Sequence, residues 1–287
     1  MISSLLLKSV SVINCQTGAT LHTRPHLSFN CTQLLSPMSK MPDALWLNVS
    51  PGLKRLHQPL LQYLAQTKQV ASWEYRPSLD EVSSVEMAVT LLHDYLKQNN
   101  RPIHLMGHST GGAIALTYAR LHPHRVASLS ILGVGAQPAI TWHAHYYVLR
   151  KLFPCSREQI LAQMTRSLLG HCPAALIKEL VRWLAYDLDH SPLPHSLLSI
   201  AESPKAGVSM PLLVCGCRTD AIVDPSALAA WQELLKPGDR LWECPDGHHF
   251  FHYTYPALVG QQIRVFWQSL ASLEKAVSSP EKAIPST

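Results

Sequence analysis

At 287 residues, with 47% hydrophobic and only 15% charged side chains, the chain can bury a large apolar core and is not disordered over most of its length. The formal charge of +5 is spread thinly, without a run of Lys or Arg, which argues against a nucleic-acid-binding surface. No apolar stretch reaches the roughly 18 residues of a membrane-spanning helix, so only peripheral contact with a membrane remains open.

Residues 1–42 differ from the rest because they contain no Asp or Glu and show no sustained periodicity. We interpret them as a disordered or mis-annotated N-terminal extension. A segment poor in acids and rich in Ser and Thr is also typical of a transit peptide, to a plastid or another organelle, and this alternative stays open. Otherwise the cytoplasm is expected, because the seven cysteines lack the spacing of a disulfide framework or a zinc site. Cys215 and Cys217, which share a face of a predicted strand, are interpreted as buried free thiols.

From residue 43 the pattern alternates between short apolar runs and segments of helical periodicity. The predicted strands are 44–50, 69–75, 102–107 and 125–135, with helices over 78–100 and 111–123. The first of these helices begins with Ser78 and Glu81 at the spacing of a capping box. Such alternation predicts an α/β fold with a mostly parallel sheet covered by helices on both faces.

The alternation stops over 138–205, where prolines separate segments that are all predicted to be helical. These segments are 140–153, 156–170, 173–188 and 193–203. The pattern then resumes with a strand at 210–217, a helix at 225–235, a strand at 239–245 and a closing helix at 255–277. We therefore predict a core of 43–137 and 206–275, a helical cap insertion of 138–205 and a flexible tail of 276–287.

The predicted cap is rich in aromatic residues, which together favour an apolar pocket for a hydrophobic substrate. They are Trp142, Tyr146, Tyr147, Phe153, Trp183 and Tyr186. His143 and His145 alternate within the first cap segment, and we interpret them as a surface pair rather than as metal ligands.

Residues 107–111, with the sequence GHSTG, form a polar turn between a predicted strand and a predicted helix. The pattern G-x-S-x-G in this context holds a nucleophilic serine on a sharp turn. Glycines are needed because side chains at the flanking positions would collide with the neighbouring strand and helix. We predict that Ser109 stands above the sheet edge, where the N–H of Thr110 can stabilise an oxyanion at the helix N-terminus.

A nucleophilic serine needs a general base and an acid that orients the base. Two acids, Asp220 and Asp224, follow the fifth predicted strand, and three histidines, His248, His249 and His252, follow the sixth. The order Ser, acid, His agrees with the G-x-S-x-G turn.

With these motifs in place, the chain resembles the α/β-hydrolase superfamily over roughly 43–275, through "GHSTGG", "TDAIVD" and "GHHFFHYTYP". The resemblance implies that Asp220 is the acid, because it heads the motif Asp-x-Ile-Val. It implies His249 as the base, because this residue stands seven positions before the proline that starts the last helix. Asp224 and His248 are the alternatives, whereas His252 is expected to pack on the helix.

Many relatives carry His-Gly after the first core strand, and the next residue donates an N–H to the oxyanion hole. This chain has Ser50-Pro51-Gly52-Leu53 there, and Pro51 has no N–H to donate. We expect Thr110 and Leu53 to form the oxyanion hole, with Gly52 as the alternative to Leu53.

The resemblance implies a serine hydrolase that cleaves an apolar carboxylic ester through an acyl-enzyme, without a metal or an organic cofactor. A small hydrophobic ester is then the expected partner, and nucleic acid is not. An acyltransferase with the same triad and a ligand-binding member without turnover are the alternatives, and the oligomeric state is open. The sequence pattern "WLN.SP.LKRL..PLL.YL" also resembles cyanobacterial and plastid members of the superfamily.

Overall fold

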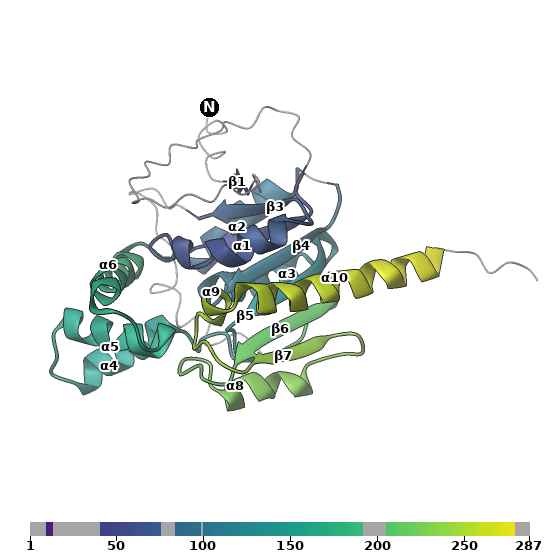
Figure 1. Ribbon diagram of the computed structural model, residues 1–287. Helices are drawn as coiled ribbons and strands as arrows, with labels where there is room; N and C mark the ends of the chain where they lie inside the picture. Colours follow the sequence, from purple (N-terminus) through teal and green to yellow (C-terminus); the bar gives the residue numbers. More distant parts are fainter. Residues whose placement is uncertain (1–9, 14–40, 76–83, 99, 192–204, 279–287) are drawn as a thin grey trace, which may run out of the picture.

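The computed structural model describes residues 10–13, 41–75, 84–98, 100–191 and 205–278. Its centre is a seven-stranded sheet in the order β1-β3-β2-β4-β5-β6-β7 (Figure 1). All neighbouring strands are parallel except β1, which runs antiparallel to β3. The strands are β1 (Val10–Val12), β2 (Ala44–Asn48), β3 (Val70–Glu74), β4 (Ile103–His108), β5 (Val126–Leu132), β6 (Leu212–Cys217) and β7 (Arg240–Cys244). The predicted mostly parallel sheet is confirmed.

Strand β1 corrects the expectation that residues 1–42 carry no structure. Within that segment only residues 10–13 and 41–42 are described, and Val10, Ser11 and Val12 pair with β3 at the edge of the sheet. Three residues are too few to produce a recognisable alternation, so this strand has no signal in the sequence.

Helices cover both faces of the sheet because its central strands are apolar on both sides. Along β2, Leu45 and Leu47 belong to one core cluster, whereas Ala44 and Trp46 belong to another. The first cluster is covered by α2 (Val85–Leu96), α3 (Thr110–Leu121) and the short α8 (Pro225–Ala229), and the second by α1 (Gln58–Ala65) and α10 (Pro256–Ser278). The one-turn helix α9 (Phe251–Thr254) precedes α10.

Two predicted helix ends differ from the structure. The capping box of Ser78 and Glu81 lies outside the described residues, and α2 begins after Ser84, whose side chain accepts the N–H of Met87 at 3.1 Å. At the other end of the chain, α10 continues to Ser278, so the first three residues of the expected flexible tail are helical.

The described part of the cap, inserted between β5 and β6, contains α4 (Trp142–Leu152), α5 (Arg157–Leu169) and α6 (Ala174–His190). They gather at one end of the molecule, beyond the carboxyl ends of the strands (Figure 1). The fourth predicted cap segment, 193–203, lies outside the described residues. An apolar cluster joins the cap to the core, since Leu180 and Leu184 of α6 share it with Leu53 and Phe250. Among the described helices, none is long and apolar enough to cross a bilayer.

Candidate active site

The turn from β4 into α3 holds Ser109 in a strained backbone conformation. Its φ of 50° and ψ of −120° lie in a region that residues with a side chain rarely adopt. A Cβ on Gly107 would lie 2.5 Å from the backbone of Gly111, and a Cβ on Gly111 would lie 2.3 Å from the carbonyl oxygen of Leu47. The glycines are therefore required by close packing, and the N–H of Ser109 is fixed by a 2.9 Å hydrogen bond to Leu132 O.

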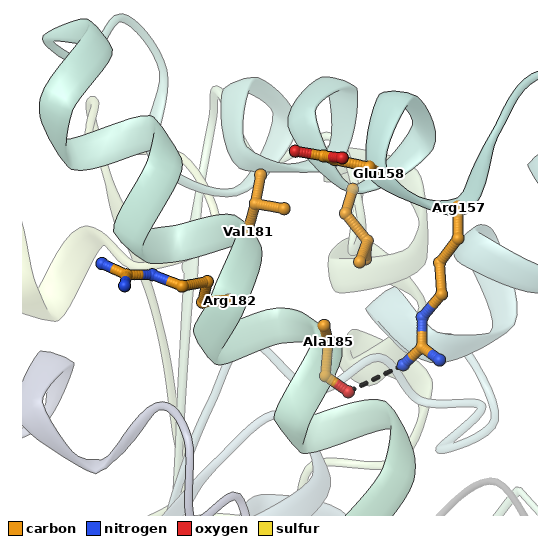
Figure 2. A pocket seen from close by; sticks show the side chains of 6 residues that line it. Arg157, Glu158, Val181, Arg182 and Ala185 are labelled. Atoms are coloured by element: carbon orange, nitrogen blue, oxygen red, sulfur yellow. Dashed lines mark hydrogen bonds between the residues drawn. The ribbon is translucent and has the colours of Figure 1, made fainter.

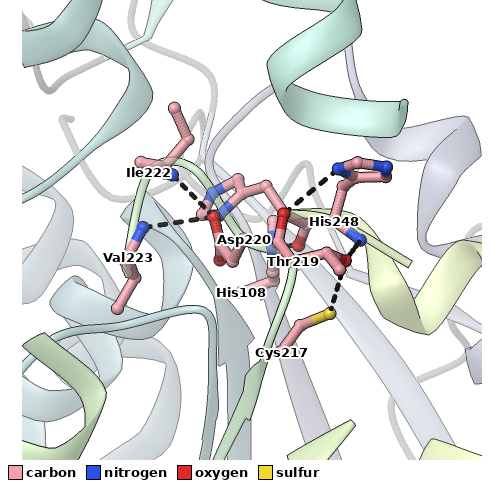
Figure 3. A network of polar contacts seen from close by, with 8 residues as sticks. His108, Cys217, Thr219, Asp220, Ile222, Val223 and His248 are labelled. Carbon is pink, nitrogen blue, oxygen red and sulfur yellow. Dashed lines mark hydrogen bonds and ion pairs between the residues drawn. The ribbon is translucent and has the colours of Figure 1, made fainter. Parts of the chain in front are cut away.

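Asp220 and His249 meet at the carboxyl ends of β6 and β7. Oδ2 of Asp220 lies 2.8 Å from Nδ1 of His249, and both side chains are buried. Oδ1 of Asp220 accepts the N–H groups of Ile222 and Val223, at 2.8 and 3.1 Å (Figure 3). With the carboxylate held this way, Nδ1 carries the proton that it donates to Asp220, and Nε2 is left as the basic nitrogen.

Ser109 and His249 both lie beside the end of β5. The N–H of Ser109 bonds to Leu132, and Cε1 of His249 lies so close to the next residue that a Cβ on Gly133 would stand 3.1 Å from it. Within the described part of the chain, neither Oγ of Ser109 nor Nε2 of His249 has a hydrogen-bond partner, and both atoms are buried. The structure thus brings Asp220 and His249 into contact and places Ser109 at the end of the same neighbouring strand as His249.

Asp224 and His248, the alternative acid and base, each bind nearby backbone groups. Asp224 caps the N-terminus of α8, where Oδ1 accepts the hydroxyl and N–H of Ser226 and the N–H of Ala227. These bonds lower its pKa. His248, with a φ of 58°, turns its Nδ1 to the carbonyl oxygen of Thr219, at 3.1 Å.

Thr219 connects the loop of the acid to the loop of the base, a link that the sequence does not reveal. Its hydroxyl donates to Oδ1 of Asp246 at 2.9 Å. The same hydroxyl accepts the N–H of His248 at 3.1 Å (Figure 3). Below it, Sγ of Cys217 lies 3.4 Å from the same hydroxyl. Cys217 and Cys215 are buried free thiols, as predicted from their spacing.

The expected second oxyanion donor, Leu53, is already engaged. Its N–H donates to Ser50 O at 3.0 Å, closing the turn around Pro51, and this corrects the sequence-based assignment. The N–H of Gly52 interacts with the carboxylate of Asp187. Of the turn's N–H groups, only that of Ser50 donates to no other described residue.

Comparison with known proteins shows the family of the chain. Residues 39–262 match the model of the alpha/beta hydrolase family. The chain belongs to the α/β hydrolase family. An uncharacterized protein of Nostoc sp. (strain PCC 7120) is 52% identical over 231 residues, which cover 80% of this chain and 92% of that protein. An uncharacterized protein of Synechocystis sp. (strain PCC 6803) is 39% identical over 235 residues, or 82% and 94%.

The fold of this α/β hydrolase is also that of an esterase from Thermogutta terrifontis. The two structures superpose with a TM-score of 0.61 over 79% of this chain and 89% of the esterase, at 20% identity.

The cap of this α/β hydrolase buries a carboxylate–imidazole pair. Asp187 of α6 and His143 of α4 are both fully buried, with Oδ2 and Nε2 3.2 Å apart. Burial raises the pKa of Asp187, although His143, Ser50 and Gly52 oppose the shift. His143 is therefore not part of a surface pair. A signal for Asp187 exists in the sequence, because it shares the apolar face of its helix with three leucines, Leu180, Leu184 and Leu188.

The cap aromatics divide into two groups. Trp142 and Tyr146 are buried in the apolar cluster that includes Phe250, and Trp183 packs against that cluster. The other three, Tyr147, Phe153 and Tyr186, are exposed, so they do not contribute to a buried apolar surface. Helical periodicity explains the difference, because α4 presents only one side to the core.

Three further histidines lie beside the candidate active site. Nδ1 of His57 lies 2.9 Å from Nε2 of His252, and Nε2 of His108 donates to the carbonyl oxygen of His249 at 2.9 Å. Burial lowers the pKa of His57 to about 3 and those of His108 and His252 well below the ordinary value. Their nitrogens lie within 4.8 Å of one another, so among the described residues this group has the spacing to hold a metal ion. However, His57 and His252 already use their facing nitrogens for each other.

A pocket of about 270 Å³ lies between α5 and α6, on the cap (Figure 2). Its lining is Arg157, Glu158, Leu161, Val181, Arg182 and Ala185, and Arg157 donates to Ala185 O at 2.8 Å. None of these residues belongs to the serine, acid and histidine group, so the pocket is separate from the candidate active site.

Proposed function

We propose that this protein is a carboxylic ester hydrolase in which Ser109 is the nucleophile, His249 the general base and Asp220 the acid that orients it. The observation that carries the proposal is the buried 2.8 Å contact between Asp220 and Nδ1 of His249, which leaves Nε2 available beside the strained serine turn. Membership of the α/β hydrolase family supports hydrolysis, and the named esterase with the same fold is consistent with an ester substrate.

In the first half of the proposed reaction, Nε2 of His249 takes the hydroxyl proton of Ser109 as Oγ attacks the ester carbonyl carbon. The tetrahedral intermediate collapses when His249 returns the proton to the departing alcohol. In the second half, His249 takes a proton from water as the water oxygen attacks the acyl carbon. The second tetrahedral intermediate collapses when His249 returns that proton to Oγ of Ser109, which releases the acid and restores the enzyme. Asp220 stabilises the imidazolium in both halves, because its carboxylate is held by two backbone N–H groups and does not need to reorganise.

The oxyanion would be stabilised by the N–H of Thr110, at the start of α3, and by that of Ser50. Thr110 supplies the first N–H of a helix, where the macrodipole favours negative charge. Ser50 is chosen over Leu53 and Gly52 because both of those N–H groups have other acceptors. Each such donor contributes on the order of 10²–10³-fold to kcat in enzymes of this kind.

An apolar substrate is supported by what surrounds the acid and the base. Ile222 and Val223 follow Asp220, Phe250 follows His249, and all three belong to the same apolar cluster as Trp142 and Tyr146 of the cap. Burying an acyl chain against these side chains is favourable by about 25 cal/mol per Å² of apolar surface removed from water.

The test is a series of p-nitrophenyl esters of increasing acyl length, assayed with the wild type, Ser109→Ala and Ser130→Ala. Ser130 is a matched control, because it is a fully buried serine on the neighbouring strand β5 whose hydroxyl also has no partner among the described residues. We expect Ser109→Ala to lower kcat by at least about 10³-fold and Ser130→Ala to retain activity.

A fluorophosphonate gives a second readout that needs no knowledge of the natural substrate. It should label the wild type on the peptide that contains Ser109, and label Ser109→Ala not at all. Labelling at Ser109 without turnover of any ester would replace the hydrolase with an acyltransferase or a ligand-binding protein. Full activity of Ser109→Ala would remove the serine mechanism altogether.

A further inference from the structure

The turn that carries the proposed oxyanion donor Ser50 packs against helix α6 of the cap. A Cβ on Gly52 would stand 2.4 Å from the carbonyl oxygen of Trp183, so the backbone of the turn and the backbone of the helix are in direct contact. Arg55, just after the turn, places its guanidinium 5.6 Å from the centre of the Trp183 ring. Helix α6 accordingly lies beside the segment that leads into α1 (Figure 1).

Asp187 lies one helical turn after Trp183, on the same side of α6, and its carboxylate reaches the same turn. The side chain is fully buried. Burial raises the pKa of the carboxylate, and the hydroxyl of Ser50 and the N–H of Gly52 are among the groups that oppose this shift. Nε2 of His143, from α4, lies 3.2 Å from Oδ2. Within the described part of the chain, these donors surround the carboxylate without closing a hydrogen bond of ideal geometry.

Such a carboxylate can fix the position of the turn. A buried carboxylate is unfavourable unless nearby donors compensate it, so Asp187 attracts the donors that its surroundings provide. Two of them, the hydroxyl of Ser50 and the N–H of Gly52, flank Pro51 on either side. Proline fixes its own φ and restricts the residue before it, so Ser50 and Pro51 move as one stiff piece. Attraction at both ends of this piece therefore sets the direction of the N–H of Ser50.

We propose that Asp187 is a positioning residue, which holds the Ser50-Pro51-Gly52 turn from the cap so that the N–H of Ser50 points into the oxyanion hole. The inference rests on the proposed function, because it concerns the same hydrolysis. Asp187 acts on the reaction only through the turn, and His143 supports its carboxylate from α4. The cap thereby takes part in the chemical step, in addition to any part in the choice of substrate.

The test compares Asp187→Asn with Asp189→Asn in the p-nitrophenyl ester assay. Asparagine keeps the shape of aspartate but has one acceptor oxygen and no charge. We expect Asp187→Asn to lower kcat about 10- to 100-fold, a part of what one oxyanion donor contributes, and to leave KM within about threefold, because the oxyanion forms only after the substrate is bound.

Asp189 is the matched control, because it lies two residues further along α6 and pairs with Arg157 at the surface, where 53% of its side chain is exposed. Asp189→Asn should keep kcat and KM within about twofold of the wild type.

Ser50→Ala tests whether Asp187 acts through the turn, since it removes the hydroxyl and keeps the backbone N–H. It should lower kcat several-fold. The double variant Ser50→Ala/Asp187→Asn should be no more than about twofold slower than Asp187→Asn alone, because both changes remove the same interaction.

Hydrogen exchange of the peptide that contains residues 50–53 gives a readout without turnover. It should be at least about threefold faster in Asp187→Asn than in the wild type or Asp189→Asn, because the turn is no longer held by the cap. Circular dichroism and the thermal midpoint establish that each variant is folded. Should Asp187→Asn fail to fold, Ser50→Ala takes its place in both measurements.

Three results would overturn the proposal. One is an unchanged kcat in the variant that lacks the contact, another is a loss confined to KM, and the third is a double variant in which the two losses multiply in full. Each of these, with an active wild type, removes the role of Asp187 and leaves the proposed hydrolysis standing. A wild type that cleaves no ester would instead remove the proposed function, and this role with it.

Discussion

The backbone N–H of Phe250 donates a hydrogen bond to the carbonyl oxygen of Leu168, at 3.1 Å. Phe250 directly follows the proposed base His249, and Leu168 lies in the last turn of cap helix α5. Nearby, the ring of His248 fills the space that a side chain on Gly170 would need, with Nε2 2.3 Å from where its Cβ would be. The loop that carries the base is therefore attached to the cap, and a displacement of α5 would be transmitted to His249.

Gly133→Ala should lower kcat/KM by about tenfold, equivalent to ~1.4 kcal/mol in the activation barrier. Gly133 has a φ of +58°, and an added Cβ would stand 3.1 Å from both Cε1 of His249 and Nε2 of His108, two buried rings with little room to move. Gly238→Ala is the control, because Gly238 also has a positive φ, +92°, but has nothing within 4 Å of the added Cβ. It should cost about 1–2 kcal/mol of stability and leave kinetics unchanged. Equal kinetic losses in the two variants would contradict the placement of His249.

Asp220→Asn should lower kcat by on the order of 10⁴-fold, because an amide can hold His249 in the wrong tautomer. Asp224→Asn should leave kcat within about twofold and reduce the free energy of unfolding by no more than about 1 kcal/mol, since asparagine is also a good N-cap. Steady-state kinetics and urea titrations of both variants decide the point. A large kinetic loss in Asp224→Asn alone would reverse the assignment of the acid.

Thr219→Val should reduce kcat several-fold and the free energy of unfolding by about 1–3 kcal/mol, whereas Thr219→Ser should retain most of both. Valine keeps the shape but removes the hydroxyl that donates to Asp246 and accepts from His248. Because the two loops then lose their direct link, KM should change less than kcat. If Val and Ser variants behave alike, the hydroxyl does not position the acid and base loops.

The buried histidines should make the fold sensitive to mild acid. Burial lowers the pKa of His57 from 6.5 to about 3. Below pH 6.5 this histidine is therefore protonated in the unfolded chain but stays neutral in the folded protein. Stability contributed by the neutral ring is thus present above pH 6.5 and lost as the pH falls, by about 1.4 kcal/mol per pH unit for each such histidine. His108 and His252 act in the same direction.

Urea unfolding between pH 7 and about pH 5 measures this dependence, because the buried rings stay neutral in the folded protein throughout that range. His57→Phe should reduce the slope of stability against pH by about one proton. Trp46→Phe is the control, because Trp46 packs on His57 and His252 without titrating, and it should keep the wild-type slope. A slope that is the same in His57→Phe as in the wild type would show that His57 is not kept neutral by burial.

The strand–turn–helix arrangement around Ser109 could be predicted because its determinants are local. Gly107 is required by the backbone of Gly111 only four residues away, and the apolar runs on either side specify a strand and a helix. Gly111 itself packs on the carbonyl oxygen of Leu47 in β2, a contact that only the sheet creates. The choice of Asp220 over Asp224 could not be made from local residue patterns alone. Both follow the same strand, and only the loop geometry turns one carboxylate toward His249 and the other onto the N-terminus of α8.

Contacts of the site that join separate segments were beyond local patterns. Leu53 was a reasonable oxyanion donor on spacing, but its N–H closes a turn with Ser50, and Gly52 in that turn packs against the backbone of Trp183 in the cap. The pairing of Asp187 with His143 likewise joins two cap helices. Three residues of β1 are ordered by an existing sheet edge rather than by their own preference.

The sequence by itself determined the alternation of strands and helices, the serine turn and the order in which serine, acid and histidine follow one another, because hydrophobic period and glycine sterics act over a few residues. Only the tertiary structure decided which N–H groups remain available, which histidines are buried and neutral, and which cap aromatics face water. Each of these depends on contacts between segments tens of residues apart, and burial by such contacts sets both hydrogen-bond availability and pKa.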